Sequence, residues 1–218
     1  IVRGPGSVLF GVNALHGAIN VISPTLGGDA GGDISVDIGP NEYARLNAGF
    51  KGKYDDHSFG AYFNGASDGG YKDDSGFGQQ KLNLSHRYDG GDITVTSILA
   101  ATNLNQETAG FLDMGFETYK NENLKEINSN PEAFRDAQSF RLHSRIEGST
   151  ENGGWMITPY YRDTDMTFLM HFLPGTPLEE NGHESFGVQT QYSSGNGALE
   201  WSAGVDFEHT EGFLKQTQ

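Results

Sequence analysis

The chain has 218 residues, a formal net charge of −15, 31 glycines and no cysteine. The excess of acidic residues argues against nucleic acid as a partner, since a phosphate backbone binds basic surfaces, and the missing cysteines exclude disulfides and thiolate metal sites. With 35% hydrophobic and 11% aromatic residues, the composition favours an all-β protein that is rich in turns.

The predicted elements begin with tight turns and short apolar runs. Residues 3–6, Arg-Gly-Pro-Gly, form a turn, because glycine tolerates positive φ and proline fixes φ without donating a hydrogen bond. The apolar run 8–10 leads to Gly11, and residues 18–22, Ala-Ile-Asn-Val-Ile, form a short β-prone strand. These residue types predict a compact, β-rich piece whose backbone segments approach closely.

The order of residues 1–25, IVRGPGSVLFGVNALHGAINVISPT, is more specific than their composition. It resembles the closing segment of the plug domain of TonB-dependent outer-membrane receptors, and His16 departs from the pattern at a position where we expect a small residue. The resemblance implies a plug inside a 22-stranded barrel, with this segment running into the first barrel strand. We therefore expect residues 1–26 to end a plug domain and residues 27–218 to form the N-terminal portion of the barrel.

The resemblance also implies a role for Arg3. In the family, the arginine of this motif pairs with barrel glutamates and helps to lock the plug in place; a solvated turn arginine is the alternative. The family's glutamates lie in later strands, and this chain offers Glu147, Glu200 and Glu208 as substitutes. No signal peptide precedes Ile1, which already stands inside the motif, so we expect the chain to be a fragment of a longer protein.

From Asp33 onward, apolar and polar residues alternate in segments that are separated by turn clusters. Because successive side chains of a strand point to opposite faces, each segment has an apolar and a polar face. The sequence has no apolar run of about 18 residues for a transmembrane helix, but the strands of a transmembrane barrel need only this alternation. The nine predicted strands lie within residues 34–38, 44–54, 59–64, 81–87, 93–103, 140–147, 155–162, 186–192 and 199–208.

The connections favour a barrel over a sandwich, which would show the same alternation. Short turns lie near residues 55, 90, 151 and 196, whereas long links span 67–79, 105–137 and 168–184. Short turns at one rim and long loops at the other are typical of outer-membrane barrels. We predict an all-β fold: a partial transmembrane antiparallel β-barrel of about nine meander strands, preceded by the end of a plug. Pro159 cannot donate to a ladder, which predicts a bulge or an interruption of pairing there.

The alternation also predicts which side chains share a face. The residues expected to face outward are Phe50, Phe59, Phe63, Leu82, Leu84, Leu142, Ile146, Ile157, Val188, Trp201, Val205 and Phe207. Those expected to face inward are Arg45, Lys51, Lys81, Arg87, Arg141, Arg145, Arg162, Glu200 and Asp206. A lumen lined with this many basic residues would attract an anionic cargo, such as a carboxylate-rich ferric chelate.

Three of these basic residues are candidate ligand contacts. Arg141, Arg145 and Arg162 are predicted on adjacent strands below the two longest links. Like-charged neighbours across strands repel unless something negative lies between them. That negative partner could be cargo or, in the interpretation that we favour, an acidic surface of the plug.

The link 105–137 carries further candidate contacts, Phe111, Phe116 and Tyr119. Aromatic side chains on an outer loop supply contact area at little cost in rotamer entropy. The alternative is that the loop packs on itself around a short helix, for which residues 122–127 are the best candidates.

The next link begins with the apolar run 166–173, in which Phe168 and His171 are the last candidate contacts. Two methionines and a histidine resemble a haem or copper site, but no second histidine lies close by in the sequence. We therefore expect an apolar loop strand there, with no metal and no cofactor. The chain has no nucleophile elbow, P-loop or zincin motif, so we predict that it is not an enzyme.

Together with the resemblance, these features predict a fragment of a receptor in the outer membrane of a Gram-negative bacterium. It would bind a scarce nutrient at its outer loops, most often a ferric siderophore, and import it into the periplasm. Its implied partners are the TonB energy-coupling complex, outer-membrane lipid and the anionic nutrient. The alternatives are a soluble β-sandwich or lectin-like binding module and an unplugged outer-membrane porin.

Overall fold

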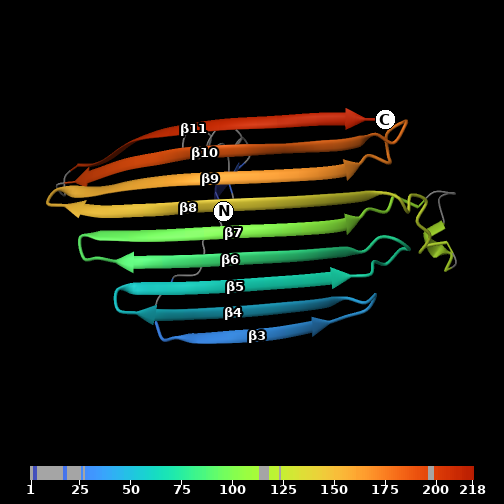
Figure 1. The fold of residues 1–218 in the computed structure, drawn as a ribbon, viewed down its shortest axis with the longest axis horizontal. Helices are drawn as coiled ribbons and strands as arrows, with labels where there is room; N and C mark the ends of the chain where they lie inside the picture. Colours follow the sequence, from blue (N-terminus) through green and yellow to red (C-terminus); the bar gives the residue numbers. More distant parts are fainter. Residues whose placement is uncertain are drawn as a thin grey trace.

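The structure is a computed structural model that describes residues 2–3, 17–18, 26, 28–112, 118–122, 124–195 and 199–218. Nine strands form one antiparallel sheet in sequence order, each paired with its neighbours along the chain (Figure 1). They are β3 (Gly31–Ile38), β4 (Ala44–Tyr54), β5 (His57–Asp68), β6 (Phe77–Asp89), β7 (Ile93–Glu107), β8 (Phe134–Thr150), β9 (Gly153–Leu169), β10 (Leu178–Gly195) and β11 (Glu200–Thr217). A separate pair joins β1 (Val2–Arg3) to β2 (Gly17–Ala18). The predicted meander is confirmed.

Short turns and long loops fall at opposite ends of the sheet, as predicted. The turns after β4, β6 and β8 lie at the left of Figure 1, and the loops after β5, β7 and β9 lie at the right. The turn between β3 and β4, residues 39–43, is the exception, because it is short and lies at the right with the loops. The loops are shorter than the sequence indicated, because they span only 69–76, 108–133 and 170–177. Several strands run on into segments, such as residues 103–107 of β7, where both faces are mostly polar and the alternation is no longer visible.

The long loop after β7 contains a 3₁₀ helix, η1 (Thr118–Lys120). The helix predicted at 122–127 is wrong, because the carbonyl of Asn121 accepts hydrogen bonds from the amides of both Leu124 and Lys125 and closes a turn instead. A segment of this length cannot offset the cost of nucleating a helix. No helix in the described part of the chain is long and apolar enough to cross a membrane.

The register sorts the strand side chains onto two faces. Leu26 packs against one of them, where its Cδ2 atom lies 2.8 Å from the place that a Cβ of Gly60 would occupy, and we call this the inner face. Directly opposite residues of paired strands lie on the same face, so the pairing extends this assignment across the sheet. Every residue predicted to face outward shares the outer face, and every residue predicted to face inward shares the inner face.

The turn end of the sheet is staggered. The row of residues paired through His57, at the start of β5, continues across the sheet to Val205 of β11. β11, however, begins at Glu200, five residues before Val205. Five residues of strand correspond to about 17 Å. A stagger of this kind accompanies the strand tilt by which sheets close into barrels.

The described residues bury almost no apolar side chain. Among them, Leu26, Ala133 and Met170 are the only buried hydrophobic residues. On the outer face Phe50 is 56% exposed and Val205 is 74% exposed. Since removal of apolar area from water is the main force that stabilises folded proteins, this face requires an apolar environment outside the sheet.

Pro159 interrupts the ladder between β8 and β9. Pairing runs to His143 and Tyr160 and resumes at Ile146 and Ile157 with the register unchanged. The prediction of an interruption is therefore confirmed, in the form of a gap without a bulge. Proline has no N–H for the neighbouring strand, and two register positions are lost there.

Candidate functional site

A hydrogen-bonded network on the inner face links β9 to β11 across β10. The carboxylate of Glu208 accepts a hydrogen bond from the Tyr160 hydroxyl, one of 2.8 Å from Arg162 and one of 2.9 Å from Thr210. The Arg162 guanidinium also lies 5.1 Å from the centre of the Tyr160 ring. Tyr160 reaches β11 over Gly187 of β10, and a Cβ at Gly187 would stand 2.5 Å from the Tyr160 hydroxyl.

The other two predicted arginines lie on the inner face of β8 and differ from one another in their partners. Arg145 forms an ion pair of 2.7 Å with Glu147. Arg141 lies directly opposite Arg162, and it makes no ion pair with any residue that the structure describes. The negative partners of Arg145 and Arg162 thus come from the sheet itself, which differs from the predicted partners, the plug and the cargo.

The long loop after β7 is held by its neighbour, the loop after β5. Lys72 donates to the Gly110 carbonyl at 2.5 Å, and Asn128 donates to the Asp74 carbonyl at 2.8 Å. The Asp73 amide donates to the Glu126 carbonyl at 2.8 Å. The loop is therefore fixed at several points rather than free to swing.

Replacing Lys72 with Ala should loosen this loop. The variant loses the hydrogen bond to Gly110, and one charge-assisted bond of this kind contributes about 1.5–3 kcal/mol. Limited proteolysis of the full-length protein should then cut within residues 108–133 several-fold faster, while cleavage elsewhere keeps its rate. Lys51→Ala, on β4 and away from this loop, is the control, and equal rates for the two variants would contradict the pinning role of Lys72.

The predicted loop aromatics differ in exposure. Phe111 is 81% exposed and Tyr119 is 61% exposed, so both are open to a ligand, whereas Phe116 lies outside the described residues. Phe168 is half-buried on β9, where its ring centre lies 4.5 Å from the Arg135 guanidinium.

The last predicted contact, His171, is also half-buried. Its ring meets that of Phe172 edge to face, with the centres 5.6 Å apart. Its buried Nδ1 atom has no hydrogen-bond partner among the described residues. All these candidate contacts remain predictions.

Sequence reasoning missed Tyr160, Gly187 and Lys72 as structural determinants. The one signal for Gly187 is that it is a glycine in the interior of a predicted strand, where a glycine often marks a close approach of another group. Tyr160 and Lys72 carry no comparable signal, because their partners are set by register and by loop packing.

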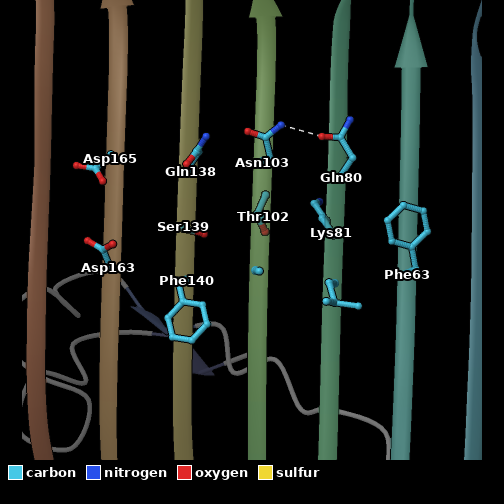
Figure 2. Close-up of a pocket in the computed structure, with 12 residues that line it drawn as sticks. Phe63, Gln80, Lys81, Thr102, Asn103, Gln138, Ser139, Phe140, Asp163 and Asp165 are labelled. Carbon is cyan, nitrogen blue, oxygen red and sulfur yellow. Dashed lines mark hydrogen bonds between the residues drawn. The ribbon is translucent and has the colours of Figure 1, made fainter.

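One hollow of the sheet lies on the outer face and not on the inner one. It has a volume of about 400 Å³ and is bordered by Phe63 and Phe140 on its apolar side and by Gln80, Asn103 and Asp165 on its polar side (Figure 2). It therefore marks the border between the apolar and polar parts of the outer surface. Within the described part of the chain, no group of three or more potential ligands is placed to hold a metal ion.

Comparison with known proteins gives a match in structure alone. No family model and no curated protein matches the sequence. The structure is similar to the ferric-catecholate import receptor Fiu from E. coli K12 in its closed form, with a TM-score of 0.81 and 16% identity over 97% of this chain and 36% of that one.

Two further solved structures are similar to the same extent. The siderophore receptor PiuA from Acinetobacter baumannii matches with a TM-score of 0.78 and 13% identity, over 98% of this chain and 34% of that one. The ferric citrate transporter FecA in the unliganded form matches with a TM-score of 0.79 and 15% identity, over 99% and 34%. The chain spans about a third of the length of these proteins, and it has the fold that its resemblance to TonB-dependent outer-membrane receptors predicted.

Proposed function

We propose that this chain is part of a TonB-dependent receptor that binds a ferric chelate, most often a siderophore, at its outer loops and imports it into the periplasm. The observation that carries the proposal is the nine-stranded sheet itself, with an apolar outer face and all its long loops at one end. The three similar structures are named as receptors or transporters of siderophores or ferric complexes. None of them is named as an enzyme.

In this proposal residues 1–26 end the plug and residues 27–218 form barrel wall in the outer membrane. Lipid contacts the apolar outer face, and the TonB complex grips a segment of the plug. In this proposal Arg3, whose side chain lies outside the described residues, locks the plug to a barrel carboxylate. Glu147 and Glu208 already pair with barrel arginines, so in this chain Glu200, on the inner face of β11, is the carboxylate we assign to Arg3.

Replacing Phe111 or Tyr119 with Ala in the full-length receptor should weaken chelate binding. Each exposed ring offers contact area on a loop that is already held in place, so little ordering is lost on binding. We expect about a five- to thirtyfold loss of affinity for the cognate ferric chelate, the range of a hot-spot truncation above 1 kcal/mol. Uptake of radioactive iron by a strain that lacks the wild-type gene measures the effect.

The matched control is Tyr54→Ala, which removes an exposed ring at the end of β4, away from the long loops and not assigned to ligand binding. Its uptake should equal that of the wild type. If the full-length protein supports uptake of no ferric chelate, the proposed function is overturned.

A further inference from the structure

Polar side chains at the two flanks of the inner face bond to one another. On the β3–β5 side, Asn64 donates to Asn47 at 2.6 Å, and Asn47 donates to Ser35 at 3.1 Å. On the β10–β11 side, the hydroxyls of Ser185 and Thr210 lie 3.0 Å apart. The side chains of these flanks thus satisfy much of their own hydrogen-bonding capacity.

The centre of the same face is different. Six side chains from β6 to β9 form a contiguous group there, which we call the central donor patch. Lys81, Thr102, Ser139 and Thr164 stand in one register row, and Asn83 and Arg141 stand in the next. None of the six makes a side-chain hydrogen bond or an ion pair with any residue that the structure describes.

The central donor patch also lacks acid. Along the inner faces of β6 to β9 the only carboxylates among the described residues are Asp89 and Glu147, and both lie toward the turn end. Asp89 is bound by Arg87 at 2.6 Å, and Glu147 is bound by Arg145 at 2.7 Å. Every side chain of the patch can donate a hydrogen bond, and two of them carry a positive charge.

The predicted plug end cannot neutralise these charges. Residues 1–28 contain neither Asp nor Glu, and the first acidic residue is Asp29. Arg162, opposite Arg141, has its charge balanced by Glu208. Among the residues that the structure describes, Arg141 and Lys81 are therefore the cations of the patch without an acidic partner, and the charge and donors there complement an oxygen-rich anion.

We infer that the central donor patch binds the carboxylate groups of an anionic ferric chelate on its way through the barrel, with Arg141 and Lys81 setting the preference for charge. The guanidinium fork suits a carboxylate in two-point contact, and the hydroxyls of Ser139 and Thr164 supply further donors. The inference rests on the proposed function and adds the chemical class of the cargo to it.

The test is equilibrium binding to the purified full-length receptor in detergent, with ferric citrate as the carboxylate probe and a neutral ferric hydroxamate as the uncharged one. Arg141→Gln and Lys81→Gln should each weaken ferric citrate binding about tenfold, the effect of one charge-assisted hydrogen bond. The loss should shrink as salt is raised, since salt screens the charges. Binding of the hydroxamate should not change.

Arg87→Gln is the matched control, because it removes a positive charge from the strand that carries Lys81 but from a residue already paired with Asp89. All variants are first compared for heat-resistant migration on gels, which reports a closed barrel. Equal losses for Arg141→Gln and Arg87→Gln would show a nonspecific effect of net charge and would overturn the inference.

Three other outcomes are also decisive. If Arg141→Gln keeps the affinity for ferric citrate but makes residues 1–26 more accessible to protease, the patch holds the plug and the inference is wrong. If the receptor binds the hydroxamate and not ferric citrate, the assigned cargo class is wrong while the proposed function stands. If it binds no ferric chelate, the proposed function itself fails.

Discussion

Replacing Leu142 with Arg should destabilise the protein by roughly 2–4 kcal/mol, the cost of a basic side chain on the lipid face near the middle of a bilayer. Leu142 lies on the outer face of β8, opposite Leu99 of β7 and Tyr161 of β9. Neither of these two neighbours carries a carboxylate, so the guanidinium of Arg at position 142 would have no ion-pair partner there and no water around it. The free energy of unfolding of the full-length protein from lipid vesicles measures the loss.

Two controls separate the effect of the face from the effect of depth. His143→Arg places the same side chain one residue away on the inner face, where we expect a change below about 1 kcal/mol. Gln138→Arg keeps the outer face but lies in the polar row beyond Phe140, and its cost should fall to about 0–1 kcal/mol. If Leu142→Arg costs no more than His143→Arg, the outer face does not contact hydrocarbon.

Alternation predicted the strands wherever one face is apolar and the other polar. Residues 140–147 show this clearly, since Phe140, Leu142 and Ile146 point outward while Arg141 and Arg145 point inward. A period of two fixes the face of every residue once the register is known. The sequence therefore indicated the order of the strands and the direction of their side chains correctly.

The ends of the strands could not be predicted in this way. β7 continues through Asn103, Asn105 and Glu107, where polar residues occupy the outer face as well. Without an apolar partner face the alternation vanishes, although the backbone still pairs. The predicted loops were too long for this reason, and the hollow beside Asn103 marks where the two kinds of outer surface meet.

The ion pairs of the inward arginines could not be predicted from the sequence either. Arg162 and Glu208 are 46 residues apart in the chain, and they meet because β9, β10 and β11 pair in one register. The sequence can place each charge on the inner face, but the distance between two charges on nonadjacent strands depends on both registers at once. Only the structure therefore shows that Arg162 is ion-paired while Arg141, directly opposite it, has no ion pair among the described residues.

Replacing Gly187 with Val should be among the most damaging changes on the inner face. A Cβ there would stand 2.5 Å from the Phe207 carbonyl oxygen as well as 2.5 Å from the Tyr160 hydroxyl. The first contact is with backbone, so it cannot be relieved by a side-chain rotation, and overpacking of this kind costs about 1–3 kcal/mol. Displacing Tyr160 also breaks its hydrogen bond to Glu208, which adds about 1.5–3 kcal/mol for a bond to a charged group.

Gly78→Val on β6 is the matched control, because the nearest atom to its added Cβ is 4.0 Å away. Measured by unfolding from lipid vesicles, it should cost less than about 1 kcal/mol. Adding Tyr160→Ala to Gly187→Val should restore only part of the lost stability, since the backbone contact with Phe207 persists. Full recovery of stability would mean that Tyr160 alone requires the glycine. An equal loss of stability for Gly187→Val and Gly78→Val would mean that β9, β10 and β11 are not as close together as the hydrogen bond between Tyr160 and Glu208 requires.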